Sequence, residues 1–482
     1  MAVLGYISSP WAPLVVVLGI AAFYLYPYFV TYGHLRQIPA PFPAQFSDLW
    51  LLSVVRRGNR YQRVHDLHKK LGPVVRIQPN HISLNDDDAI QVVLGHGSGL
   101  LKSSFYDAFV SIRRGLFNTR DRTEHSRKRK IVSHTFSAKS IVQFEPYIHG
   151  NLELFVAQLD KLIKTTPHRD RAAHFDCLEW FNFLAFDVIG DLAFGAPFGM
   201  LAAGADIAEV RASPTSPPIY APAIDILNRR GEVSAALGAL PELKPYAKYL
   251  PDPFFTKGLE AVENLAGIAI ARVKERLENP PPVSRKDLLE RLMEGRDDRG
   301  EPLGREELTA EALTQLIAGS DTTSNSSCAL LFHVVRTPGV VAKLQAELDA
   351  AIPRGVDVPT FDMVRDLPYL AAVVNETLRH HSTSGIGLPR EIPADAKQGI
   401  HFRGPERWEA LTPRQKNAFI PFSYGPRACV GRNVAEMEMK LIVATWARRY
   451  EVFLRQDYMD TREGFLRKPL GLEVGLRRRE GV

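Results

Sequence analysis

The sequence predicts a mainly α-helical protein with a small β portion, behind a single N-terminal transmembrane helix. Apolar residues recur at helical spacing through most of the chain beyond residue 45, and strand-like runs are few. Residues 11–30 carry no charged side chain. With 482 residues, 45% of them hydrophobic, the chain could form two or three domains, or one large domain plus an anchor, which is the arrangement we expect.

The first element is an apolar segment from Leu14 to Val30, whose length matches the thickness of a bilayer. A cleaved signal peptide is the alternative, but such peptides begin with basic residues, and no Lys or Arg precedes Arg36. A retained anchor over residues 1–33 is therefore favoured. The basic residues follow this segment, which predicts that the next part of the chain lies on the cytoplasmic side of the membrane.

A proline-rich stretch from Ile38 to Pro43 predicts a stiff, non-helical connector over residues 34–45, before a globular domain over residues 46–482. Periodic segments in that domain predict helices at 59–71, 139–164, 178–194, 257–278, 306–337, 339–351, 366–381 and 431–449. Strands are predicted at 74–77, 81–84 and 471–476, and a surface loop at 202–222.

Charge and cysteine content restrict the binding partners and the cellular compartment expected for this domain. The net charge is +6, and the basic runs are dispersed, so the composition does not require a nucleic-acid partner. Each run is either a solvated face or a site of attraction to an anionic membrane or an acidic protein. Cys177, Cys328 and Cys429 are too few and too scattered for a disulfide framework, which indicates a reducing compartment.

Cys429 lies in a glycine-flanked loop just before a predicted helix. Gly425 and Gly431 permit the positive φ that a tight loop under a flat ligand needs, and Arg427 can pair with a carboxylate. The free N–H groups and the dipole of the helix end favour a thiolate, the form that binds metal. Taken alone, such a cysteine is more often an inert buried thiol.

A second motif, Ala318 to Thr323, lies inside the helix predicted at 306–337. Glycine costs about 1 kcal/mol in a helix interior, and hydroxyl side chains compete for backbone carbonyls, so the motif predicts a locally opened groove. Asp321 and Thr322 place an acid and an alcohol side by side there. A patch of small residues for helix packing is the alternative.

Two further patterns contain charged side chains at helical spacing. Glu376 and Arg379 can meet on one helical face, where such a pair is usually a weak surface interaction. His125 and Arg129 stand four residues apart at the start of a basic run.

The loop from Phe422 to Gly431 reads Phe-x-x-Gly-x-Arg-x-Cys-x-Gly, which resembles the signature of the cytochrome P450 family. The resemblance implies the helical haem-binding fold of that family and a haem b cofactor, iron protoporphyrin IX, whose axial ligand is the Cys429 thiolate. Phe422, Gly425, Arg427 and Gly431 would form the haem-binding loop beside that sulfur.

The same resemblance assigns roles to the other motifs. Asp321 and Thr322 would deliver protons to dioxygen at the iron. Glu376, Arg379 and Arg407, the last from the segment 405–408, would brace the loop that carries the cysteine.

A haem propionate would be contacted by Arg129 and His125. The family usually has tryptophan at the position of His125, and both side chains can donate a hydrogen bond.

Two runs, Arg113–Arg122 and His381–Arg390, resemble the fungal benzoate 4-hydroxylase branch, and this likeness extends from about residue 34 to residue 478. It implies hydroxylation of a small aromatic acid, benzoate, at the para position. Another aromatic compound or a fatty acid is the alternative substrate. The donors expected to hold the carboxylate are Arg113, Arg114, Ser382 and Thr383.

The resemblance also implies partners. These are dioxygen, membrane lipid and a separate NADPH–cytochrome reductase, for which the basic run Arg127–Lys130 is a candidate docking face. The expected location is the endoplasmic reticulum membrane, with a single span and a catalytic domain that faces the cytosol.

The chain departs from the family pattern between Arg379 and Arg407, which are only 28 positions apart. Relatives have several dozen more residues in this interval. We infer a missing segment near residues 395–405, centred on residues 402–404. A shortened product that does not bind haem is therefore the alternative to an active enzyme.

Overall fold

The computed structural model describes residues 11–165, 172–281, 285–296, 300–392 and 418–481. These residues form two compact units: one that contains the described residues up to Ser98, with Ala418, and one that contains the other described residues from Gly99 onward. The domain boundaries predicted from the sequence, at residues 33 and 45, fall within the first unit and stay predictions.

The first unit begins with the apolar helix α2 (Ala12–Tyr26), which continues through a helical turn at Pro27–Thr31. The stretch Ala12–Thr31 is long and apolar enough to cross a membrane, and none of it is buried. The rest of the unit contains α3 (Leu49–Arg56), α4 (Arg60–Leu71), the antiparallel strands β1 (Val74–Gln78) and β2 (His81–Leu84), and α5 (Asp87–Leu94).

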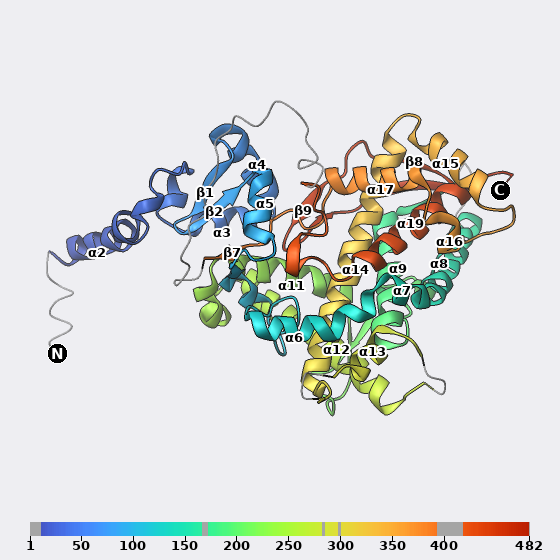
Figure 1. Cartoon of the computed structure of the whole chain (residues 1–482), viewed down its shortest axis with the longest axis horizontal. Helices are drawn as coiled ribbons and strands as arrows, with labels where there is room; N and C mark the ends of the chain where they lie inside the picture. The colour runs from blue at the N-terminus through green and yellow to red at the C-terminus, as the bar shows by residue number, and fades with distance from the viewer. Residues whose placement is uncertain (1–10, 166–171, 282–284, 297–299, 393–417, 482) are drawn as a thin grey trace. The chain divides into compact units, whose positions relative to one another are not determined.

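The second unit is mainly helical, as Figure 1 shows. Its α-helices are α6 (Arg122–Ser133), α7 (Ala138–Ile141), α8 (Glu145–Thr165), α9 (Cys177–Phe194), α10 (Met200–Ala203), α11 (Ala223–Ala239), α12 (Pro253–Glu278), α13 (Leu288–Glu294), α14 (Arg305–Arg336), α15 (Val340–Ala351), α16 (Phe361–Val364), α17 (Pro368–His380) and α19 (Arg432–Arg449).

Short antiparallel strands complete this unit. They form a three-stranded sheet of β4 (Ala173–Asp176), β11 (Glu473–Arg478) and β8 (Tyr450–Leu454), and three pairs: β3 (Leu101–Lys102) with β7 (Arg390–Glu391), β5 (Ala208–Val210) with β6 (Ile219–Ala221), and β9 (Thr461–Glu463) with β10 (Arg467–Pro469).

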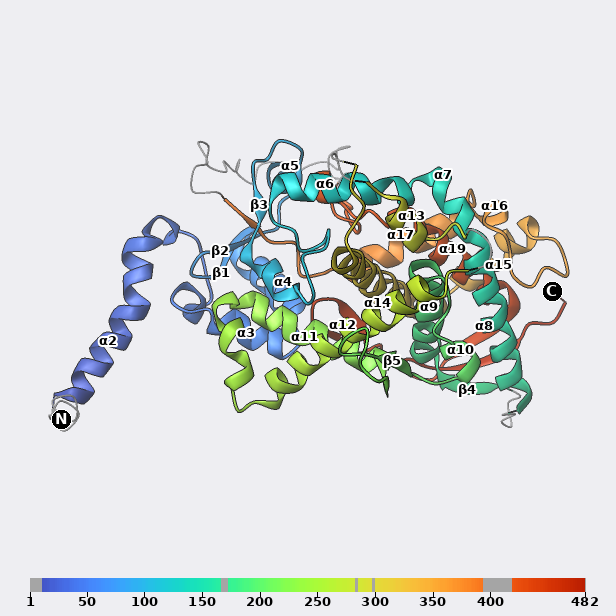
Figure 2. The ribbon, with the colours of Figure 1, turned by 90° about the horizontal axis from the view of Figure 1, so that it is seen from below.

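Helix α14 is the centre of the second unit. It is 32 residues long and packs against α9, α12, α17 and α19; α11 and α12 lie side by side, as Figure 2 shows. Its buried side chains, such as Leu316 and Leu330, occupy most of its circumference, as expected of a helix enclosed by others. A side chain at Gly319 would lie 2.6 Å from Cδ1 of Ile189, so this glycine permits the close approach of α9.

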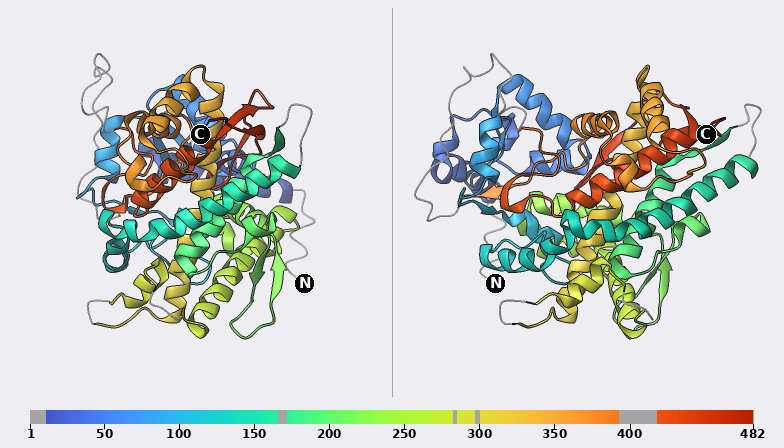
Figure 3. Two further views of the ribbon diagram at one scale, coloured as in Figure 1. Left: turned by 90° about the vertical axis from the view of Figure 1, so that its right-hand side faces the viewer. Right: turned by 45° about the vertical axis from the view of Figure 1, so that its right-hand side comes forward.

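The structure confirms the main helices and strands that the sequence predicted, with two corrections. The predicted loop at 202–222 contains the hairpin β5–β6, whose three-residue strands are too short to show a period in the sequence. The predicted ranges also omit several helices, namely α3, α5, α6, α10, α11, α13 and α16. Figure 3 shows the red helix α19 beside the teal α8, with which it is in contact.

Candidate functional site

Cys429 lies at the end of a tight loop that precedes α19. Its backbone N–H donates to the carbonyl of Phe422 at 2.8 Å and closes the loop. The chain passes through positive φ at Ser423 (62°) and at Gly425 (71°), as predicted for the latter. Gly431 has a φ of −84°, so the prediction of positive φ there is wrong. It is instead the N-cap of α19, a position that glycine tolerates well.

The thiol of Cys429 is accessible, because this residue is exposed whereas Cys177 and Cys328 are buried. An inert core thiol is therefore the wrong interpretation of Cys429. Desolvation by the surrounding protein raises the pKa of the thiol, and the N–H group of Gly431 and the charge on Arg129 only oppose that rise. The N–H groups at the helix end lower the pKa of the thiol, in the predicted direction, and a bound metal ion would stabilise the thiolate further.

Two arginines attach this loop to the preceding helical region. Arg129 of α6 donates to the carbonyl of Ala428 at 2.8 Å. Arg427 donates to the carbonyls of Thr119 at 2.9 Å and Arg120 at 3.3 Å. Arg427 therefore bonds to backbone carbonyls here rather than to a carboxylate.

These two arginines belong to a larger group of basic side chains, which we call the cation cluster: Lys102, His125, Arg129, Arg390 and Arg427. The pairing of β3 with β7 places Lys102 opposite Arg390. Burial and the neighbouring arginine charges lower the pKa of Lys102, and they lower the pKa of His125 to about 3. Burial and the charge on Arg390 lower the pKa of Arg427 to about 10. Among the described residues, no carboxylate forms an ion pair with Lys102, Arg129, Arg390 or Arg427.

The cation cluster fits an anionic ligand that is bound next to the sulfur. Nη2 of Arg390 is buried and has no hydrogen-bond partner within the described parts of the chain. Haem carries two propionate groups and an iron that accepts a sulfur ligand, so an accessible thiol beside unpaired cations fits this cofactor. The sequence indicated His125, Arg129 and Arg427 but not Lys102 or Arg390, because those two meet only through the pairing of β3 with β7.

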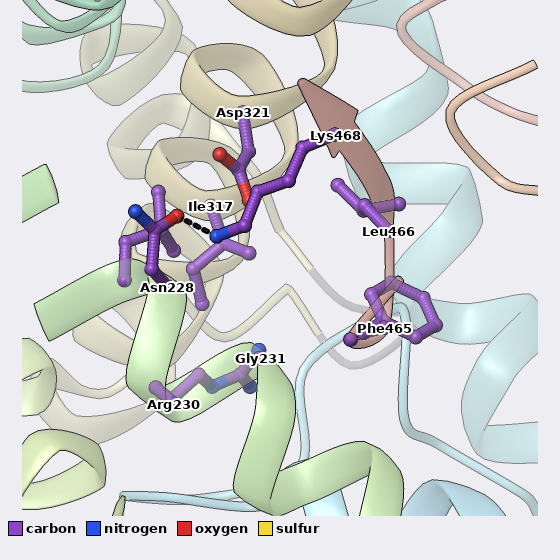
Figure 4. Close-up of a pocket in the computed structure, with 10 residues that line it drawn as sticks. Asn228, Arg230, Gly231, Ile317, Asp321, Phe465, Leu466 and Lys468 are labelled. Atoms are coloured by element: carbon purple, nitrogen blue, oxygen red, sulfur yellow. Dashed lines mark hydrogen bonds between the residues drawn. The ribbon is translucent and has the colours of Figure 1, made fainter. Parts of the chain in front are cut away.

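Asp321 of α14 lines a pocket, shown in Figure 4, together with Asn228 and Arg230 of α11 and Phe465 and Lys468 of the β9–β10 hairpin. Burial raises the pKa of Asp321, and the charge on Lys468, a hydrogen bond with Asn325 and the charge on Arg230 oppose that rise. A carboxyl group with a raised pKa can both give and take a proton closer to neutral pH.

Thr322, the other member of the predicted pair, donates its hydroxyl to the carbonyl of Ala318 at 2.6 Å. The predicted competition of hydroxyl groups for backbone carbonyls is therefore present, but it is satisfied within one helical turn. Helix α14 is continuous from Arg305 to Arg336, so the predicted opening of the helix is wrong. Packing by small residues, the alternative interpretation of this motif, applies to Gly319.

Glu438 of α19 is a polar residue that the sequence analysis did not single out. It is buried, and Thr323 donates its hydroxyl to Oε2 of Glu438 at 2.8 Å. Burial raises the pKa of Glu438 to about 7, against the effect of that hydrogen bond. The available signal was an acidic residue on the apolar face of the helix that follows Cys429.

The predicted pair of Glu376 and Arg379 is formed on α17. Two parallel hydrogen bonds of 2.8 and 2.7 Å join the guanidinium to the carboxylate. Both side chains are exposed, at 60% and 57%, as expected of a surface pair. Arg407, the predicted third member, lies outside the described residues, so the bracing role stays a prediction.

The four predicted substrate donors differ in burial and in the groups that they contact, and their role stays a prediction. Arg113 and Arg114 are exposed, and Arg114 forms an ion pair of 2.6 Å with Asp107. Ser382 is half-buried, and Thr383 is buried, with its carbonyl accepting the N–H of Arg467 at 2.8 Å.

Comparison with known proteins identifies relatives along the whole chain. A model of the cytochrome P450 family matches residues 39–404 and 401–476. Benzoate 4-monooxygenase bphA of Aspergillus niger is 58% identical over 99% of each chain. A cytochrome P450 monooxygenase of Aspergillus flavus is 27% identical over 97% of each chain, and tryprostatin B 6-hydroxylase of Neosartorya fischeri is 27% identical over 87% of this chain and 76% of its own.

The same comparisons bear on the missing segment. The two blocks matched by the family model meet at residues 401–404. The alignment with the Aspergillus niger protein spans 519 positions, whereas this chain has 482 residues, so at least 37 positions have no residue of this chain opposite them. Both observations support a segment missing from this chain relative to that protein. The match to the family model, together with the 58% identity over nearly the full length, shows that the chain belongs to the cytochrome P450 family.

Proposed function

We propose that this chain is a haem-thiolate monooxygenase that hydroxylates benzoate to 4-hydroxybenzoate. The observation that carries the proposal is the 58% identity, over 99% of each chain, to the benzoate 4-monooxygenase of Aspergillus niger. The relatives at 27% identity include a tryprostatin hydroxylase, so they support the reaction class rather than the substrate.

In this reaction one atom of dioxygen enters the para C–H bond of the ring. The other atom leaves as water, with two electrons and two protons. When bound, the haem iron supplies the dioxygen activation. Cys429 would hold the haem iron through its Sγ atom. Arg129, Arg427 and the rest of the cation cluster would hold the propionates by charge-assisted hydrogen bonds.

Asp321 and Thr322 would supply the protons. Asp321 can carry a proton because burial raises its pKa. It can also release that proton, because Lys468 and Asn325 stabilise its ionised form. The hydroxyl of Thr322 can accept one proton while it donates another, once it turns away from the carbonyl of Ala318.

We propose that α2 anchors the chain in the endoplasmic reticulum membrane with the catalytic domain in the cytosol, where an NADPH–cytochrome reductase would supply electrons. The apolar stretch Ala12–Thr31 and the basic residues that follow it support this orientation. The basic run Arg127–Lys130 offers little surface for docking, because Lys128 is buried and both Arg127 and Lys128 form ion pairs with Glu307. The reductase face would therefore draw on other residues.

The proposal is tested with the purified full chain in detergent or nanodiscs. We expect the Soret band of thiolate-ligated haem in the reduced, carbon-monoxide-bound spectrum, and a high-spin shift of the ferric form on addition of benzoate. With a reductase and NADPH, chromatography should detect 4-hydroxybenzoate. Loaded haem that responds to a fatty acid but not to benzoate would contradict the substrate. A preparation without any haem band would show that the chain lacks the activity.

A further inference from the structure

A groove of about 320 Å³ lies between α3 and α4 of the first unit, in the blue part of Figure 1. Four apolar side chains line it, namely Pro41, Trp50, Val54 and Leu67. Val54 is buried and the other three are half-buried. The volume lies within the range of small-ligand sites, roughly 300–1,000 Å³. The groove therefore has room for a ligand much larger than a water molecule.

The charged side chains of the groove are mostly basic. They are Arg57, Arg63 and Lys70, with one acid, Asp66, and all four are exposed. Among the described residues, no carboxylate forms an ion pair with Arg63 or Lys70. The groove therefore keeps a net positive charge, which favours a ligand with negative charge.

Helical spacing explains why apolar and basic groups meet in this groove. Arg63 and Lys70 are seven positions apart on α4, with Leu67 between them, so the three share one face of that helix. Trp50, in the first turn of α3, and Arg57, at its C-cap, have the same spacing. Each helix thus presents an apolar side chain and a cation to the groove, a combination that fits an amphiphilic ligand.

The groove belongs to the same unit as the apolar stretch Ala12–Thr31, and the end of that stretch packs on the rest of the unit. Tyr28 lies 4.6 Å from Phe46, ring centre to ring centre, and the Cζ atom of Arg76 lies 5.8 Å from the ring centre of Tyr28. The N–H of Arg76 donates to the carbonyl of Pro39 at 2.9 Å, which attaches β1 to the proline-rich connector. A membrane that holds the apolar stretch would therefore lie close to this unit.

Two large apolar side chains beside the groove are exposed. Phe42, which follows Pro41 of the groove wall, is 79% exposed. Leu49, which precedes Trp50, is 56% exposed. The ring centre of Phe42 also lies 5.9 Å from that of Phe46, which contacts the end of the apolar stretch. Exposed apolar side chains next to tryptophan and basic residues are typical of a protein face at the membrane–water interface.

We propose that the groove between α3 and α4 binds the headgroup of an anionic phospholipid from the membrane in which α2 is anchored. This inference rests on the proposed membrane anchoring and adds a lipid site to it. Arg57, Arg63 and Lys70 would bind the acidic groups of the headgroup by charge-assisted hydrogen bonds. Trp50 and Leu67 would contact the glycerol backbone and the first carbons of the acyl chains.

A lipid explains more of this surface than another anion does. A free phosphate ion would use the cations, but it would leave the apolar wall of the groove and the exposed Phe42 and Leu49 without a partner. An anionic bilayer provides both the charge and an apolar layer beneath it, at the place where the apolar stretch ends.

The test uses the full chain in a neutral detergent and measures dissociation constants by calorimetry for dihexanoyl phosphatidylserine and dihexanoyl phosphatidylcholine. We expect the wild type to prefer phosphatidylserine by at least about tenfold, because each nearby cation contributes about a fivefold change. Arg63→Gln and Lys70→Gln should each weaken phosphatidylserine about fivefold and leave phosphatidylcholine unchanged. Asp66→Asn should strengthen phosphatidylserine by a similar factor, because the carboxylate that repels the headgroup is removed.

Lys69→Gln is the matched control, because Lys69 is exposed on the same helix but does not line the groove. It should behave as the wild type. Equal affinity for the two lipids, or an equal loss in Lys69→Gln and Lys70→Gln, would mean that the groove does not select the headgroup, and the inference would be wrong. Inorganic phosphate that competes at the same concentration as phosphatidylserine would show a site for a free anion, which also contradicts the inference.

Membrane anchoring is tested separately, by flotation of the full chain with vesicles of phosphatidylcholine alone. The wild type and Arg63→Gln should both float, because α2 inserts without help from the groove. A chain that does not float contradicts the proposed anchoring, whereas the lipid titrations in detergent decide whether the groove binds the headgroup.

Discussion

Two regions of the second unit, each rich in arginine, balance their charge in opposite ways. In one, which we call the paired cluster (Asp191, Arg276, Arg285, Asp287 and Glu290), every cation meets a carboxylate. Asp287 lies 3.0 Å from both Arg276 and Arg285, and Arg285 also pairs with Asp191. In the cation cluster, by contrast, burial and the charges of neighbouring arginines lower the pKa values of Lys102 and Arg427.

The difference in ion pairing indicates a structural role for the paired cluster and a ligand-binding role for the cation cluster. The charges of the paired cluster are satisfied within the protein, so that cluster joins α9, α12 and α13 and needs no ligand. The cation cluster raises the free energy of the protein as it stands, and an anion would remove that cost. Cys429 lies next to the second kind of region, since Arg129 bonds to the carbonyl of the residue before it.

The largest expected effect is at the sulfur. Cys429→Ser should remove the Soret band of thiolate-ligated haem from the reduced, carbon-monoxide-bound spectrum entirely, because serine offers no thiolate to the iron. Cys328→Ser is the matched control, since Cys328 is buried and far along the chain from the loop. An unchanged band in Cys429→Ser would mean that haem does not bind at the Cys429 loop and the cation cluster beside it.

The paired cluster should respond in stability alone. Asp287→Asn removes the carboxylate shared by the buried Arg276 and the half-buried Arg285. Glu290 and Asp191 still pair with them, so we expect a loss of about 1–3 kcal/mol in the free energy of unfolding. Chemical denaturation of the full chain, followed by circular dichroism, measures it. Haem content per folded molecule should not change. A neutral effect on stability would contradict the distinction between the two clusters.

Glu438 differs from both clusters, because no ion pair with a cation is found for this buried acid among the described residues. Burial raises the pKa of Glu438 from 4.5 to about 7. The folded chain therefore keeps this proton at pH values where the unfolded chain has lost it. Stability is lost as the pH rises from about 4.5 to about 7 and then levels off. Glu438→Gln should remove this loss, so its advantage in unfolding free energy over the wild type should grow to on the order of 3 kcal/mol at pH 8.

Denaturation curves at pH 5, 6, 7 and 8 test the sign of this effect. A glutamine can still accept the hydroxyl of Thr323, so the hydrogen bond is preserved in the variant. An advantage that shrinks as the pH rises would mean that Glu438 is ionised and stabilised in the folded chain.

The sequence was sufficient to predict a site residue where the motif that indicates it is made of neighbouring residues. The loop around Cys429 and the helix with Asp321 were found because their residues are consecutive. Helix α6 was missed because few of its side chains are buried and half of them are charged. Lys102 and Arg390 carry no local signal at all, since 288 positions separate the two strands that bring them together. Arg230 was missed because the adjacent pair Arg229 and Arg230 is typical of a surface until the burial of Arg230 is known.

The smallest expected effect concerns two buried lysines, whose replacement by methionine should change the free energy of unfolding in opposite directions. Lys102 and Lys128 are both buried, but Lys128 forms ion pairs with Glu307 and Glu311, whereas Lys102 faces arginines. In a haem-depleted preparation, Lys128→Met should destabilise the chain. Lys102→Met should leave it as stable or more stable by about 1 kcal/mol, because a buried cation among like charges is removed.

Haem binding should show the reverse order. Lys102→Met should weaken haem retention severalfold, measured by transfer of haem to an excess of apomyoglobin, because one positive charge near the propionates is lost. Lys128→Met should retain haem at the wild-type rate once folded. If Lys102→Met destabilised the haem-depleted chain as much as Lys128→Met does, the cations beside Cys429 would be structural, and the two arginine-rich regions would differ only in the identity of their partners.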